Sequence, residues 1–102
     1  MRVLMTAVIN TEAGSRAIQE GKISDMIERT MRQLQPEAVY FGPVDGRRAA
    51  FIVFDLKEAS DIVPISESLY QQLGAEVSFI PVMTPDDLQA GFQKLGAADA
   101  GR

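Results

Sequence analysis

Residues 38–56, AVYFGPVDGRRAAFIVFDL, limit the possible folds of this chain more than any other stretch. Two runs rich in apolar and aromatic residues flank Asp45-Gly46, a dipeptide that favours the tight turn joining two antiparallel strands. A two-residue loop at this turn pairs Val44 with Arg47 and Tyr40 with Phe51. The turn dipeptide and the two flanking strand patterns therefore both predict a β-hairpin.

Both faces of this hairpin are largely apolar. With a two-residue loop, one face carries Tyr40, Gly42, Arg47, Ala49, Phe51, Val53 and Asp55, and the other carries Val39, Phe41, Ala50, Ile52, Phe54 and Leu56. A sheet that is apolar on both sides needs a covering layer on each side. Because 102 residues make one domain with a modest core, we expect helices to cover one face and a second copy of the chain to cover the other.

The remaining chain alternates between strand and helix patterns. We expect strands over residues 2–10 and 75–83, helices over 11–20, 22–35, about 61–73 and from 84 onward, with Thr11 as the first N-cap. Gly21 breaks the first helical region, and Gly74 ends the later helix in a left-handed conformation. Pro81 indicates that its strand lies at a sheet edge or ends there.

This order predicts an α+β protein with a ferredoxin-like βαββαβ fold. Its sheet has four antiparallel strands with the helices on one face, and an extra C-terminal helix follows. We expect residues 1–95 to form a single domain and residues 96–102 to form a flexible tail. Two such sheets, packed face to face, close into a dimeric α/β barrel with a space between them.

Composition excludes several kinds of chemistry. The chain has no Cys and no His, so it has no thiolate nucleophile, no Ser/His pair, and no zinc site of the usual kind. It has no glycine-rich phosphate loop, and we expect no cofactor and no metal. Its net charge of −4 disfavours nucleic acid and acidic membrane surfaces as partners. Without a signal peptide or a long apolar run, a cytoplasmic location is expected.

Three segments resemble a bacterial family of small domains of unknown function within the dimeric α/β-barrel superfamily. They are MRVLMTAVIN, PEAVYFGPVDGRRAAFIVFDL and AEVSFIPVMTPDDL, and the resemblance covers most of residues 1–92. Its most specific parts are Pro36-Glu37-Ala38 before Tyr40-Phe41, Asp45-Gly46 with Arg48, and Pro81-Val82-Met83 before Asp87-Leu88. The superfamily includes cofactor-free monooxygenases and isomerases. The resemblance implies the dimeric barrel, and it singles out Arg48.

Tyr40 and one arginine of the Arg47-Arg48 pair are the first candidates for a binding site inside this barrel. A phenol and a guanidinium together hold a carboxylate or phenolate oxygen. The length of the hairpin loop decides between the arginines, because a two-residue loop puts Arg47 on the face of Tyr40 and a three-residue loop puts Arg48 there. The alternative is that Tyr40 packs in the core and both arginines are solvated; we favour Arg48 because of the resemblance.

Thr6, Asn10 and Ser78 are further candidates for neutral hydrogen bonds to a ligand. The alternative for Asn10 is a helix cap, and the hydroxyls also suit bonds to the backbone. Met5, Met26 and Met31 fall on apolar stripes, and we expect them to pack in the core.

The sequence indicates two candidate functions. One is a homodimer that binds or transforms a small aromatic or enolisable molecule in the barrel without a cofactor. The other is a non-catalytic dimeric module with a structural or regulatory role. Whether the chain is an enzyme stays open.

Overall fold

A computed structural model of the chain describes residues 1–100, with side chains described up to Gly96. The elements in chain order are β1 (Arg2–Val8), α1 (Thr11–Gln19), α2 (Ile23–Leu34), β2 (Ala38–Val44), β3 (Arg47–Asp55), a short 3-10 turn η1 (Ala59–Asp61), α3 (Ile62–Leu73), β4 (Glu76–Pro81) and α4 (Pro85–Ala100). The four strands form one antiparallel sheet in the order β2-β3-β1-β4. The predicted α+β, ferredoxin-like fold class is confirmed.

The hairpin turn has the two-residue form. Asp45 and Gly46 both have positive φ angles, 51° and 76°, which are the angles of a type I′ turn. Val44 therefore faces Arg47 and Tyr40 faces Phe51 across the hairpin. The expectation that Arg48 shares a face with Tyr40 is wrong, because this loop places Arg47 on that face and turns Arg48 to the other.

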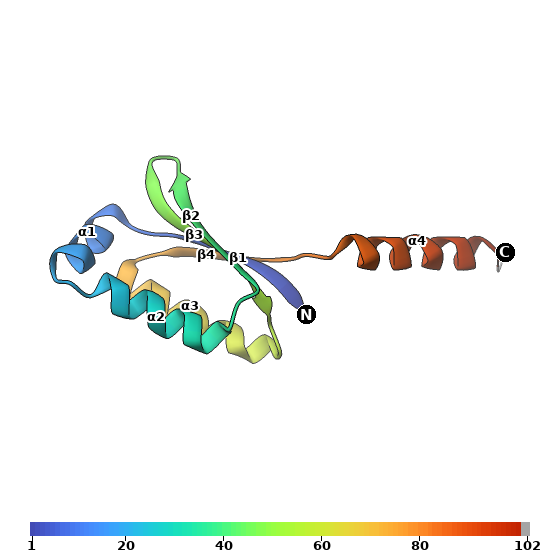
Figure 1. Ribbon diagram of the computed structural model, residues 1–102, viewed down its shortest axis with the longest axis horizontal. Helices are drawn as coiled ribbons and strands as arrows, with labels where there is room; N and C mark the ends of the chain where they lie inside the picture. Colours follow the sequence, from blue (N-terminus) through green and yellow to red (C-terminus); the bar gives the residue numbers. More distant parts are fainter. Residues whose placement is uncertain (101–102) are drawn as a thin grey trace.

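Helices α2 and α3 lie on one side of the sheet (Figure 1). Beneath them, Val3 and Met5 of β1 and Ile52 and Phe54 of β3 form a buried core with Leu34 of α2 and Ile65 of α3. The ring of Phe54 meets that of Phe79 edge-on, with 6.4 Å between their centroids. The core is thus centred on β1 and β3, the two inner strands.

Local signals account for most of the helix boundaries. Gly21 has a φ of 71° between α1 and α2, and Gly74 has a φ of 52° after α3, as expected from residues that adopt the left-handed region without steric cost. Two caps were predicted for α1, and Asn10 is confirmed while Thr11 is wrong: the side-chain oxygen of Asn10 accepts the N–H of Ala13 at 3.0 Å.

Within residues 1–100, no helix covers the face of the sheet opposite α2 and α3 (Figure 1). We call it the open face; its central residues are Leu4, Thr6, Val8, Ala38, Tyr40, Ala49, Phe51, Val53, Ser78 and Ile80. Tyr40 is 70% exposed there, and Ile80 is 49% exposed. The two apolar faces predicted for the hairpin are confirmed, whereas the homodimer that was expected to cover one of them stays a prediction.

Helix α4 leaves the end of β4 and extends away from the rest of the molecule (Figure 1). It gives the described chain a longest dimension of 62 Å, against 27 and 19 Å in the other directions. Its backbone continues through Gly96 to Ala100. A flexible tail was expected at residues 96–102. Most of these residues lie outside the part of the chain whose side chains are described, and the flexible tail therefore stays a prediction.

Candidate functional site

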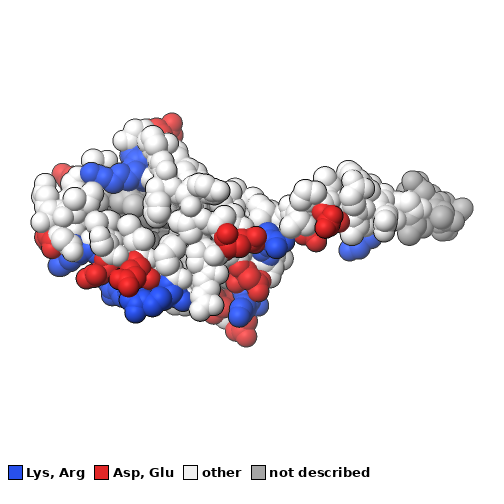
Figure 2. Space-filling model, viewed as in Figure 1, with Lys and Arg blue, Asp and Glu red and all other residues white. Residues whose placement is uncertain are grey.

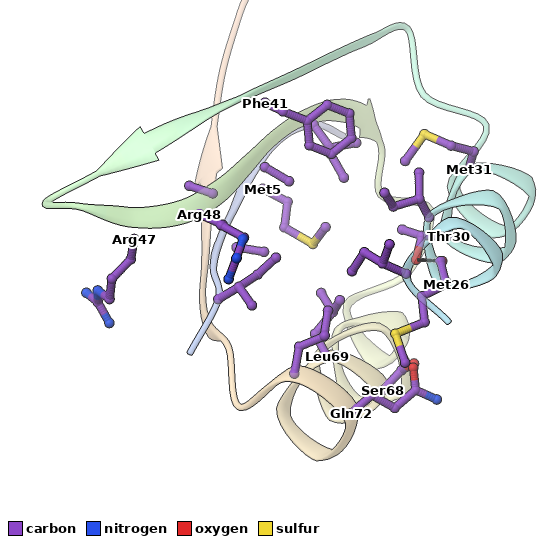
Figure 3. A pocket seen from close by; sticks show the side chains of 18 of the residues that line it. Met5, Met26, Thr30, Met31, Phe41, Arg47, Arg48, Ser68, Leu69 and Gln72 are labelled. Carbon is purple, nitrogen blue, oxygen red and sulfur yellow. Dashed lines mark hydrogen bonds between the residues drawn. The ribbon is translucent and has the colours of Figure 1, made fainter. Parts of the chain in front are cut away.

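A groove lies between α2 and the sheet and has a volume of about 630 Å³. We call it the α2 groove. Its apolar lining includes Met5 and Ile52 from the sheet, Ile23, Met26, Ile27 and Met31 from α2, Phe41 from β2, and Leu69 and Leu73 from α3. Figure 3 shows methionine side chains from the strand and the helix around this space.

The two halves of α2 pack differently on the rest of the molecule. Leu34, at the end of α2, is buried in the core, whereas Ile27, near its middle, is 37% exposed. Thr30 lies between these residues, and its hydroxyl donates to the Met26 carbonyl oxygen at 2.9 Å within the helix. The apolar stripe of α2 therefore contacts the core at one end and lines an open groove at the other.

Arg48 faces the α2 groove, whose lining also includes Arg29 and Arg47. Its guanidinium points towards the space, while that of the neighbouring Arg47 points away from it (Figure 3). The Nη atoms of Arg48 donate to the Ser15 hydroxyl at 3.3 Å and to the Thr11 carbonyl oxygen at 3.4 Å. These acceptors are neutral, and no described carboxylate forms an ion pair with Arg48.

Gly14 makes room for this guanidinium. If residue 14 carried a Cβ atom, that atom would lie 3.1 Å from Nη1 of Arg48 and 3.0 Å from Cγ2 of Ile9, which is tighter than an ordinary van der Waals contact. The Ile9 N–H also donates to the Arg48 carbonyl oxygen at 2.8 Å. Helix α1 thus approaches the start of β3 closely only because residue 14 has no side chain.

Arg47 has a different environment on the open face. Its two Nη atoms donate to the carboxylate of Glu76 at 3.2 and 3.3 Å, in a bidentate pair. This pairing raises the pKa of Arg47 and lowers the pKa of Glu76, in each case first through the hydrogen bond and then through the charge of the partner. Arg47 therefore shares a face with Tyr40 but is already bound to an acid.

The other predicted site residues do not form one cluster. Thr6 and Ser78 are neighbours across β1 and β4 on the open face, and Tyr40 belongs to the same row through Phe51. Asn10 lies away from this row and caps α1. The structure therefore keeps Tyr40, Thr6 and Ser78 on one face, and it separates them from Asn10 and Arg48.

Sequence reasoning missed the groove-lining role of the methionines. Met5 is fully buried, as expected, but Met26 and Met31 line the α2 groove in addition to facing the core side of the helix. The spacing of three and four residues along the whole stripe, which is Ile23, Met26, Ile27, Met31 and Leu34, identifies an apolar helix face. It carries no information on the distance between α2 and the sheet. No sequence pattern identified Gly14 or Ser15 as residues of a site.

Two possible features are absent from the described part of the chain. No group of three or more acidic side chains gathers there in a way that suits a metal ion. No helix among the described residues has the length and apolar character needed to cross a membrane.

No protein-family model and no curated protein matches this sequence. Among solved structures, the chain is similar to the de novo designed protein Ferredog-Diesel, with 12% sequence identity and a TM-score of 0.47. The similarity covers 79% of this chain and 85% of the designed chain.

Proposed function

We propose that this protein is a homodimer that binds a small, mainly apolar molecule with one anionic group, without a cofactor. The ligand lies in the α2 groove, and its anionic group meets Arg48. The observation that carries the proposal is the combination, in one groove, of a methionine-rich lining and a guanidinium whose described partners are neutral.

The size and lining of the α2 groove fit this class of ligand. Small-molecule sites typically have volumes of about 300–1,000 Å³, and this groove has about 630 Å³. Met5, Met26 and Met31 supply flexible, polarisable side chains that adapt to an aromatic or an aliphatic body. Size and lining thus favour a ligand of one or two rings over a single ion.

The anionic group is inferred from Arg48. Its bonds of 3.3–3.4 Å to Ser15 and Thr11 are long for hydrogen bonds of a charged donor. A carboxylate, sulfonate or phenolate offers a shorter, charge-assisted alternative, and an enolisable molecule offers the same as its enolate. Because the described lining of the groove contains no Asp or Glu to act as a base, we propose binding rather than a reaction.

A non-catalytic dimeric module is a second candidate, favoured by the open face. Tyr40 and Ile80 expose apolar surface at a place where a sheet normally has a second layer. The homodimer is common to both candidates, so ligand binding distinguishes them.

The test uses anilinonaphthalene sulfonate, an aromatic anion whose fluorescence rises in apolar sites. We expect saturable binding with one probe per chain, and Arg48→Gln to weaken it about 5- to 10-fold, which corresponds to the loss of one partly exposed charge-assisted bond of about 1–1.4 kcal/mol. The matched control is Arg32→Gln, which removes the same charge from α2 at an exposed residue outside the groove lining and leaves the affinity unchanged.

Thr30→Phe separates the groove from other apolar surfaces. The added ring extends from the stripe of α2 into the groove and is expected to block the probe. If Arg48→Gln and Thr30→Phe both bind the probe as the unmodified chain does, the α2 groove is not the site.

A further inference from the structure

Helix α4 has an apolar stripe that is exposed in the described part of the chain. Leu88, Phe92 and Leu95 recur at the spacing of one helical face, and they are 43%, 52% and 64% exposed. The radius of gyration, 17.3 Å, exceeds the value of about 13 Å expected for a compact chain of this length. The excess reflects a helix that stands away from the core (Figure 1).

This helix is a poor candidate for stability on its own. It has 16 residues, close to the length at which even alanine-rich helices are marginal in water. Gly91 and Gly96 lie within it, and each costs about 1 kcal/mol of helix stability relative to alanine. A helix of this kind needs a surface on which to pack its apolar stripe.

The connection to β4 holds α4 away from its own sheet. The Val82 N–H donates to the Arg2 carbonyl oxygen at 3.1 Å, so the chain stays paired with β1 beyond Pro81. Pro85 then keeps the preceding residue, Thr84, out of the helical region and therefore extended. The short connection between the two prolines runs outward from β4 (Figure 1), and short hinges favour exchange of an element between two copies.

The first turn of α4 is also tied to the end of the sheet. Thr84 and Asp87 cap each other: the Thr84 N–H donates to the Asp87 carboxylate at 3.0 Å, and the Asp87 N–H donates to the Thr84 hydroxyl at 3.1 Å. Arg2 lies 3.6 Å from the same carboxylate. Acidic and basic side chains meet where the chain leads from the body into α4 (Figure 2). These contacts define the direction of the helix.

The open face is an apolar surface of the kind on which the stripe of α4 can pack. Leu4, Phe51 and Val53 are half-buried at its centre, beside the exposed Tyr40 and Ile80. Its charged residues stand at the two ends, with Arg47 and Glu76 at one and Arg2 and Asp55 at the other. The middle of this face can therefore receive an apolar helix without burying a charge.

We propose that α4 is an arm exchanged between two copies of this chain, and that Leu88, Phe92 and Leu95 of each copy pack on the open face of the other. The arrangement forms the same contact twice around a two-fold axis, which closes the assembly as a dimer. It leaves both α2 grooves free for ligand. The inference rests on the proposed homodimer and assigns the contact that holds it.

The test measures mass by light scattering and sedimentation at micromolar concentrations. We expect the unmodified chain to have twice the mass of one chain and Phe92→Asp to raise the dissociation constant of the dimer at least 100-fold, because the charge enters the middle of the contact. Gln93→Asp adds the same charge on another side of α4 and leaves the dimer unchanged. Circular dichroism confirms that both variants keep the folded domain.

A second pair of variants tests the receiving surface. Tyr40→Asp lies on the open face and is expected to dissociate the dimer, whereas Phe41→Asp, one residue on and facing the helix side, leaves the mass unchanged. If Phe92→Asp stays dimeric while Tyr40→Asp does not, the sheets pack face to face; the α4 exchange is then wrong, and the homodimer stands. A monomeric unmodified chain overturns both. Probe binding in the α2 groove is measured separately and decides the ligand proposal independently of either result.

Discussion

Gly14→Ala tests whether α1 is packed against the arginine of the proposed site. Two terms of opposite sign act on the free energy of unfolding. Replacing glycine by alanine inside a helix adds about 1 kcal/mol of stability. Against this, the new Cβ lies 3.0 Å from Ile9 Cγ2 and 3.1 Å from Arg48 Nη1, and such overpacking costs about 1–3 kcal/mol.

The balance depends on which neighbour moves. Arg48 is exposed, so its guanidinium yields at little cost, whereas Ile9 is only partly exposed and is held by its N–H bond to the Arg48 carbonyl oxygen. We therefore expect Gly14→Ala to lower the free energy of unfolding by about 0–2 kcal/mol. Displacement of Arg48 also weakens binding of anilinonaphthalene sulfonate severalfold.

Urea denaturation and fluorescence titration provide the two measurements. Ser15→Ala is the comparison variant, since it removes a neutral acceptor of Arg48 and introduces no clash. If Gly14→Ala instead raises the free energy of unfolding by about 1 kcal/mol, with unchanged probe affinity, α1 does not pack on Arg48 and the reasoning fails.

Three further changes test the fold. Phe54→Ala removes a ring that is 2% exposed in the core and is expected to cost about 3–5 kcal/mol of unfolding free energy, measured by urea denaturation; a cost below about 1 kcal/mol contradicts this core. Gly46→Ala places a side chain at a φ of 76° and is expected to cost about 1–2 kcal/mol, with loss of hairpin amide protection in hydrogen exchange. Arg47 holds the pKa of Glu76 below its ordinary value of 4.5. The contribution of Glu76 to the free energy of unfolding is therefore full above that pH and declines as the pH falls below it. In denaturation at a series of pH values, Glu76→Gln therefore differs most from the unmodified chain near neutral pH, and a difference that grows on acidification contradicts the pairing.

The local parts of the fold follow from the sequence alone. Asp45-Gly46 encodes the two-residue turn, because few other dipeptides adopt two successive positive φ angles without strain, and the turn determines the pairing of Val44 with Arg47. Gly21 and Gly74 mark helix boundaries for a similar reason. Period-two alternation in the strands then predicts two apolar faces, and the order of the elements predicts the ferredoxin-like sheet.

The tertiary structure decided the position of the candidate site. The distance between α2 and the sheet depends on the sum of many side-chain contacts, so no motif in the stripe of Met26 and Met31 indicates a groove. Arg48 reaches that groove because the hairpin register turns it towards α1 and Gly14 leaves room there. The outward course of α4 likewise depends on contacts with Arg2, a residue far away in the chain. Turn and strand signals act over a few residues and are therefore readable in the sequence, whereas the α2 groove and the uncovered arm arise only when whole elements pack together.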